Sequence, residues 1–323
     1  MTKKERVIAA INGQNVDGIP SGFSLHFPRE IAFGENAVKA HLDFFRDTDT
    51  DILKIMNENL VPYAGEIDTP ADYAKVKSFS IKDSFMQDQV HLTERILDGC
   101  DHDAFIMGTL HGVTASAIHP MEHMKKQDFD YNGVRAYLTE LMRNDFQPVL
   151  DGMKRITDGM CELAGKYVEM GVDGVYYAAL GGERRFFTDE EFAEWIEPLD
   201  KKILTAIKEA GGYCFLHICK DDLNMDRYKN YGKYCDVVNW GVYEAPYSLE
   251  QGHAMFPGKA IMGGLPNRHG VLVDGSIDDV QKAVREVIAR NGRSKFILGA
   301  DCTLATEQDL SRIRAAVEAA RNA

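Results

Sequence analysis

A repeated alternation constrains the fold of this chain more than any other feature. Short apolar runs recur along the sequence, and stretches with apolar residues at helical spacing lie between most of them. The apolar runs cover residues 18–25, 51–56, 104–107, 174–178, 213–217, 237–240, 260–263 and 296–299. Runs of this kind predict buried strands, and the helical stretches between them predict the crossovers of a parallel sheet.

Eight predicted strands with helices between them favour a (β/α)8 (TIM) barrel over an open doubly wound sheet. An open sheet often carries a glycine-rich phosphate turn, and neither GxGxxG nor GxxxxGK[ST] occurs here. Helical patterns at 145–170, 189–210 and 276–290 fit the crossovers, the last with Ser276 as its N-cap. The sequence therefore predicts a single TIM-barrel domain over residues 1–323, with a short helical extension at the N-terminus.

Composition argues against several classes of protein. The formal net charge of −13 disfavours nucleic-acid binding by a basic face. The opening MTKKERVIAAING is a short amphipathic helix rather than a signal peptide, and no run of 18 apolar residues could span a membrane. We therefore expect a cytoplasmic protein whose six cysteines are thiols or metal ligands rather than disulfides.

In a TIM barrel, the residues just past the carboxyl ends of the strands form the active site. LHICKD ends the fifth predicted strand and GADCTL follows the eighth. His217 and Cys219 are two residues apart in an extended segment and should point to the same side, and barrel closure can bring Cys302 to the same rim. The same alternation predicts that, in the pair at 176–177, one tyrosine faces the pocket and the other the core.

One nitrogen and two sulfur ligands favour zinc, and three protein ligands leave a fourth position for water or substrate, as in catalytic sites. The spacing alone also allows another interpretation, in which His217 is a buried histidine with internal partners and both cysteines are core residues. Placement of the three residues at two predicted strand ends favours the metal site.

These motifs resemble a known family. The segments KERVIAAINGQNVDGIPSGF, MGGLPN and LGADCTL are similar to the uroporphyrinogen decarboxylase superfamily, and the similarity extends over nearly the whole chain. Within it, the chain resembles the corrinoid-linked methyltransferase branch, in which an H-x-C motif and a distant cysteine bind zinc. The resemblance implies that His217, Cys219 and Cys302 bind Zn²⁺. It also implies that methylcobalamin or cob(I)alamin is supplied by a separate corrinoid protein.

The chain departs from its relatives in two places. The decarboxylases carry an arginine-rich segment after the first strand, whereas SGFSLHFPRE contains Arg29 alone, which disfavours a substrate with many carboxylates. Some zinc methyltransferases use an acidic fourth ligand after the sixth strand, where NWGVYEAP has Gly241 with Glu244 close by. Glu244 could be a displaceable fourth metal ligand, or a solvated loop carboxylate.

Further polar residues at predicted strand ends are candidates for work on the substrate. His111 could donate a hydrogen bond to a leaving oxygen, and Glu183 could orient a hydroxyl or act as an acid. His26, Trp240 and Asn267 could contact the substrate. Structural alternatives stay open: a loop histidine, an ion pair of Glu183 with an adjacent arginine, and a tryptophan packed in the core.

Three functional hypotheses follow. The leading one is a zinc-dependent methyltransferase that moves a methyl group between a small methyl ether or thiol and the corrinoid protein. Zinc would lower the pKa of a thiol or polarise a methoxyl oxygen. We favour demethylation, because no anchor for an anionic thiol is evident. The second is a metal-free decarboxylase or lyase, and the third is a docking protein whose zinc is structural. A homodimer also stays open.

Overall fold

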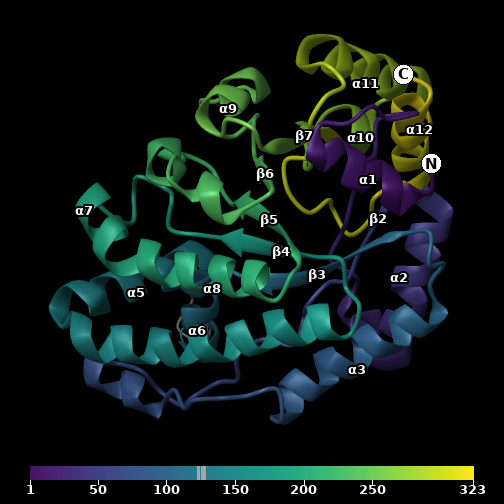
Figure 1. The fold of residues 1–323 in the computed structure, drawn as a ribbon. Coiled ribbons are helices and arrows are strands. Elements are labelled where there is room, and N and C mark those ends of the chain that lie inside the picture. The colour runs from purple at the N-terminus through teal and green to yellow at the C-terminus, as the bar shows by residue number, and fades with distance from the viewer. Residues whose placement is uncertain (122–123, 125–128) are drawn as a thin grey trace.

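The structure is a computed structural model that describes residues 1–121, 124 and 129–323, and these form one parallel barrel surrounded by helices (Figure 1). The strands are β1 (Ser21–Gly22), β2 (Ile52–Lys54), β3 (Phe105–His111), β4 (Gly174–Ala179), β5 (Tyr213–Ile218), β6 (Val237–Trp240), β7 (Ala260–Leu265) and β8 (Phe296–Ala300). Parallel ladders join them in the order β1-β8-β7-β6-β5-β4-β3-β2. The Asp51 amide donates to the Ser21 carbonyl at 3.0 Å and thereby draws β2 toward β1. The predicted (β/α)8 barrel is confirmed.

The helices follow the strands and cover the outside of the barrel (Figure 1). They are α1 (Lys3–Asn12), α2 (Gly34–Thr48), α3 (Ser84–Gly99), α4 (Val113–Ile118), α5 (Tyr131–Asn144), α6 (Phe146–Glu169), α7 (Asp189–Glu191), α8 (Glu197–Glu209), α9 (Leu249–Met255), α10 (Val271–Asp274), α11 (Ile277–Asn291) and α12 (Leu310–Arg321). Short turns η1 (Arg29–Ile31), η2 (Pro70–Lys75), η4 (Phe192–Ile196), η5 (Met225–Tyr228) and η6 (Tyr231–Tyr234) lie in the connections. No helix among the described residues is long and apolar enough to cross a membrane.

Some boundaries differ from those predicted. The first strand is shorter than residues 18–25, although Leu25 makes an isolated bridge to Leu304. Strand β3 runs on beyond residue 107, because Gly108 to His111 continue the parallel ladder with β4; the ring of Tyr167 packs on Gly108, where a Cβ would lie 2.8 Å from it. The helix predicted at 189–210 is divided into α7, η4 and α8, because η4 is a π-helical turn.

The two ends of the barrel are closed in different ways. The predicted N-terminal helix is observed as α1, and its Val7, Ala10 and Ile11 pack into a buried cluster with Phe105 and Phe215 from the barrel interior. This helix therefore covers the amino ends of the strands. The carboxyl ends carry the βα connections, and the cavity described below lies there.

Candidate metal centre

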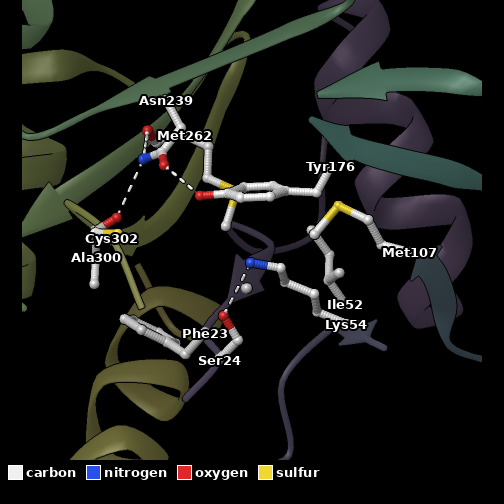
Figure 2. A pocket seen from close by; sticks show the side chains of 11 residues that line it. Phe23, Ser24, Ile52, Lys54, Met107, Tyr176, Asn239, Met262, Ala300 and Cys302 are labelled. Carbon is white, nitrogen blue, oxygen red and sulfur yellow. Dashed lines mark hydrogen bonds between the residues drawn. The ribbon is translucent and has the colours of Figure 1, made fainter. Parts of the chain in front are cut away.

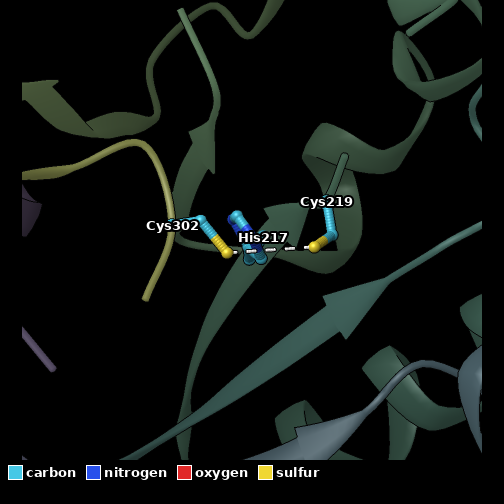
Figure 3. A group of neighbouring side chains, drawn as sticks. All are labelled: His217, Cys219 and Cys302. Atoms are coloured by element: carbon cyan, nitrogen blue, oxygen red, sulfur yellow. Dashed lines mark hydrogen bonds between the residues drawn. The ribbon is translucent and has the colours of Figure 1, made fainter. Parts of the chain in front are cut away.

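Three side chains predicted to bind metal come together at the carboxyl ends of the strands. His217 lies in β5, Cys219 directly follows that strand, and Cys302 lies two residues past β8. Their ligand atoms all lie within 4.8 Å of one another, and the sulfur atoms of Cys219 and Cys302 are 3.9 Å apart (Figure 3). The alternation of the extended β5 segment thus places an imidazole and a thiol on the same side, facing a second thiol.

The geometry of these residues fits a zinc ion. A sulfur separation of 3.9 Å is far too long for a disulfide. Two sulfurs bound at about 2.3 Å to one tetrahedral zinc would lie about 3.8 Å apart. His217 is 2% exposed, yet neither ring nitrogen makes a hydrogen bond of normal geometry with the described residues. Because buried polar groups are rarely left without a partner, the imidazole is suited to a metal.

The two thiols are coupled. A hydrogen bond from Cys219 lowers the pKa of Cys302 well below its ordinary value. The same bond, together with burial, raises the pKa of Cys219 well above its ordinary value. Cys302 is therefore the more readily deprotonated of the two thiols, and both would have to lose their protons to bind a metal as thiolates.

A cavity of about 360 Å³ opens in front of the three residues. Its walls carry three cationic side chains that make no ion pair with the described residues: Lys54, Lys220 and Arg268. One carboxylate, that of Glu58, also lines the cavity. The cavity is thus predominantly cationic, although the chain as a whole carries a formal charge of −13.

Two of the predicted substrate or catalytic residues line this cavity. His26 lies opposite Glu58, with 2.5 Å between Nδ1 and Oε1, and this contact lowers the pKa of the Glu58 carboxyl despite its burial. His111, at the end of β3, contacts His119 edge to face. Burial lowers the pKa of His111 to about 4, so its imidazole is neutral at neutral pH.

Two predicted residues are buried away from the cavity walls. Trp240 is fully buried, donates to the Tyr247 carbonyl at 3.1 Å and packs against Gly252 of α9. Alternation along β6 explains this, because the preceding residue, Asn239, faces the barrel interior. Glu183 is also fully buried, and its partner is Arg135 of α5 at 2.6 Å rather than an adjacent arginine.

Asn267 and Glu244 also lie outside the cavity walls. The Asn267 amide donates to the Thr303 carbonyl at 3.0 Å and so braces the segment that carries Cys302. Glu244 is exposed on the turn after β6 and is not part of the group that includes His217. Its role as a fourth metal ligand stays a prediction.

Sequence reasoning singled out neither Lys54 nor its neighbour Tyr176 individually. Lys54 ends β2 and lines the cavity, with its ammonium 3.5 Å from the centre of the Tyr176 ring (Figure 2). The same ring stacks on His217 at a centroid distance of 5.2 Å. The signal for Lys54 is a lysine in the middle of the apolar run 51–56, two residues after Ile52 and on the same side of the strand.

The pair at 176–177 divides as strand alternation predicts. Tyr176 lines the cavity, and its hydroxyl donates to Asn239 at 2.9 Å. Tyr177 points into the helical layer, where its hydroxyl bonds to the buried Asp200 of α8.

The fold and the site together define a parallel (β/α)8 barrel with a candidate metal centre of one nitrogen and two sulfurs at the carboxyl ends of its strands. Comparison with known families identifies the family. The sequence matches the model described as uroporphyrinogen decarboxylase (URO-D) over residues 54–323, so the chain belongs to this family. No curated protein matches it significantly.

Solved structures agree with this fold. A methyltransferase from Methanosarcina mazei superposes with a TM-score of 0.75 at 15% identity, covering 99% of this chain and 98% of that chain. A B12-independent methionine synthase from Shewanella sp. W3-18-1, in complex with selenomethionine, gives a TM-score of 0.60 at 13% identity and covers 94% and 97%. At these identities the likeness establishes the shared fold.

Proposed function

We propose that this protein is a zinc-dependent methyltransferase that moves a methyl group between a small substrate and a separate corrinoid protein. The observation that carries the proposal is the group formed by His217, Cys219 and Cys302, which faces a cavity of about 360 Å³. Three protein ligands leave a fourth position for the substrate. When bound, zinc would lower the pKa of a thiol or polarise the oxygen of a methyl ether.

The resemblance of the sequence to the corrinoid-linked branch supports the corrinoid partner, and one structure of similar fold is named a methyltransferase. Surface character adds support. Large apolar side chains are exposed on the connections after β1, β2, β3 and β6: Phe33, Tyr63, Phe129 and Tyr243. All four connections follow the carboxyl ends of strands, the end of the barrel at which the cavity opens, and a partner protein docked over the cavity would meet them.

The chain's own residues have separable tasks in this proposal. His111 is neutral at neutral pH and can donate a hydrogen bond to a leaving oxygen without acting as a strong acid. His26 and Glu58 are hydrogen-bonded to each other at the cavity wall. Glu183 is assigned a supporting role, because its carboxylate is paired with Arg135.

The choice between the two directions of transfer rests on whether the cavity can hold an anionic thiol. The sequence alone favours demethylation, because it shows no evident anchor for an anionic thiol. The cavity wall carries cations, and Lys220 and Arg268 are candidates for such an anchor. The direction therefore stays open, and both a thiol acceptor and a methyl ether donor belong in the first assays.

A metal-free decarboxylase or lyase is the second candidate, and the same three cations favour it, since they could hold carboxylates. Arg29, the one arginine of the segment after the first strand, lies in η1 and does not line the cavity. A metal site accounts for the close grouping of His217, Cys219 and Cys302, whereas a metal-free reaction does not require it, which is why we place that reaction second.

Metal analysis tests the proposal first. We expect about one zinc per chain in the purified protein and almost none in Cys302→Ser, because loss of one of three ligands should cost far more than the tenfold to hundredfold typical of supporting residues. Cys161→Ser, at a partly buried cysteine of α6, is the matched control and should keep its zinc. Zinc-free wild-type protein would favour the lyase.

Unfolding experiments separate a catalytic from a structural zinc. If the metal is catalytic, the zinc-free Cys302→Ser variant should lose methyl transfer between methylcobalamin and a thiol while unfolding as cooperatively as the wild type. If the variant instead unfolds with the loss of metal, the zinc is structural.

A further inference from the structure

The cavity contains a cation whose counter-charge is missing from the described part of the chain. The ammonium of Lys54 has one hydrogen bond, to Ser24 Oγ at 3.3 Å, and one ring contact, with Tyr176 at 3.5 Å (Figure 2). No carboxylate of the described residues lies within 4.0 Å of it. The Glu58 carboxylate on the same wall is already bonded to His26.

A cation held in this way is costly for the protein. Desolvation lowers the pKa of Lys54 to about 8, and the nearby thiols of Cys302 and Cys219 oppose that shift. Lys54 is partly buried, whereas two buried cations have carboxylate partners: Arg6 contacts Asp51 at 2.5 Å and Arg135 contacts Glu183 at 2.6 Å. Since the described residues supply no carboxylate partner for Lys54, an anion bound in the cavity that it lines could supply the counter-charge.

A charge count shows which ligand fits. A divalent metal bound by a neutral imidazole and two thiolates has no net charge. An anionic atom at the fourth position gives the centre a charge of −1, which a lysine ammonium would neutralise. Lys54 shares the cavity with all three candidate ligands, and the Tyr176 ring that it contacts stacks on His217. The ammonium is thus close to the place where the negative charge would develop.

We propose that Lys54 is an anion-binding residue that stabilises the thiolate, alkoxide or phenolate form of the substrate atom at the metal's fourth position. This inference rests on the proposed function. For a thiol, the S–H bond breaks, the sulfur keeps the electron pair and binds the metal, and the proton leaves to solvent. Lys54 stays protonated and contributes its charge.

The test uses cobalt(II) in place of zinc and 2-mercaptoethanol as the probe, with no turnover. A thiolate-to-cobalt absorption band reports binding as a function of pH. In Lys54→Met we expect thiol binding at neutral pH to weaken about tenfold and its apparent pKa to rise by about one unit. Lys54→Arg should restore both to within about threefold, since it keeps the charge.

Two controls make the result specific. Arg268→Gln removes a cation from an exposed position on the same wall and should have a much smaller effect, because solvent screens it. The second control repeats the titration with 3-mercaptopropionate, which adds a carboxylate. A defect confined to this probe would mean that Lys54 binds a remote anionic group, and it would overturn the proposal.

The remaining outcomes are also distinct. Unchanged thiol binding in Lys54→Met, with a normal cobalt spectrum, would overturn this inference and leave the metal centre intact. An equal loss of thiol binding in Arg268→Gln would mean that the overall positive charge of the cavity, and not Lys54 in particular, stabilises the thiolate. This result would also overturn the inference. If wild-type protein binds no cobalt, the proposed function itself fails. Should Lys54→Met not fold, Lys54→Gln gives the same neutral comparison.

Discussion

The two ends of strand β2 carry charges in different situations. The carboxylate before the strand is paired with a cation, whereas the lysine at its end has no carboxylate partner among the described residues, and the two ends of the barrel show the same difference. Directly before the strand, Asp51 is fully buried, and its carboxylate contacts Arg6 at 2.5 Å and accepts from the Ser21 amide at 2.9 Å. At the strand's other end, Lys54 has no carboxylate partner among the described residues. Only two residues, Ile52 and Leu53, therefore lie between a charge that is paired within the chain and one that has no carboxylate partner among the described residues.

The difference teaches which end serves stability and which serves function. At the amino end, buried charges are matched within the chain, and Arg6 also contacts Asp17 at 2.7 Å. At the carboxyl end, the His217 nitrogens and the Lys54 ammonium are left for something that enters the cavity. The same division between the two faces is expected of TIM barrels in general.

The largest effect on stability is expected from Arg6→Met. It leaves the buried Asp51 carboxylate without its closest cation and should lower the free energy of unfolding by about 3–5 kcal/mol. Zinc content should stay at the wild-type level, because the substitution lies at the amino ends of the strands, which we call the closed end, and not at the carboxyl ends that carry the candidate metal ligands. Urea unfolding and metal analysis measure the two quantities separately.

Lys4→Met is the matched control for that substitution. Lys4 lies on the same helix α1 and contacts Asp173 at 2.5 Å, but its side chain is 41% exposed. We expect less than about 1 kcal/mol from it. A loss of zinc in Arg6→Met without a loss of stability would contradict the division between the two ends.

The pH dependence of stability should also differ between the ends. His41 is buried beside the carboxyl end of β2, where Nε2 accepts from the Met56 amide at 2.9 Å, and burial lowers its pKa to about 4. Between pH 6.5 and about 4 the unfolded state binds a proton that the folded state does not. The free energy of unfolding should therefore decrease as the pH is lowered through this window, by at most about 3 kcal/mol.

His41→Gln should remove the His41 share of the pH dependence between 6.5 and 4, measured as urea midpoints at several pH values, while His111, whose pKa burial also lowers to about 4, keeps its own share. At the closed end, the hydrogen bond from Arg6 lowers the pKa of Asp17 below its ordinary value of 3.8. Its stabilising contribution is therefore present above pH 4 and lost below it. Asp17→Asn should therefore change the pH dependence of the free energy of unfolding only below about pH 4.

The sequence predicted the parts that depend on local pattern. Eight apolar runs predicted the barrel, and the i, i+2 spacing of His217 and Cys219 placed both side chains together with Cys302. The orientation of Trp240 was harder, because a short apolar run does not show which of its faces meets the helices. The partner of Glu183 depends on a distant segment, since Arg135 reaches it from α5.

A smaller effect is expected from Asn267→Ala. Its amide braces the Thr303 carbonyl next to Cys302, so removing it should loosen one candidate metal ligand and weaken zinc binding about tenfold. Asn57→Ala is the matched control, because Asn57 donates to the Thr109 carbonyl at another strand end, away from the sulfurs. Competition with a zinc-binding dye measures both affinities, and equal losses would argue against specific bracing of Cys302.

Glu244→Gln should have the smallest effect and decides whether the open end supplies three metal ligands or four. Glu244 is exposed, and its carboxylate oxygen lies near Gly241 on its own turn rather than with the sulfurs. We therefore expect zinc affinity to change by less than about twofold, because a solvated carboxylate contributes little. A loss greater than tenfold would mean that the turn after β6 folds inward when metal binds. The fourth position would then be protein-filled at rest, and a substrate would have to displace Glu244 before Lys54 could act on it.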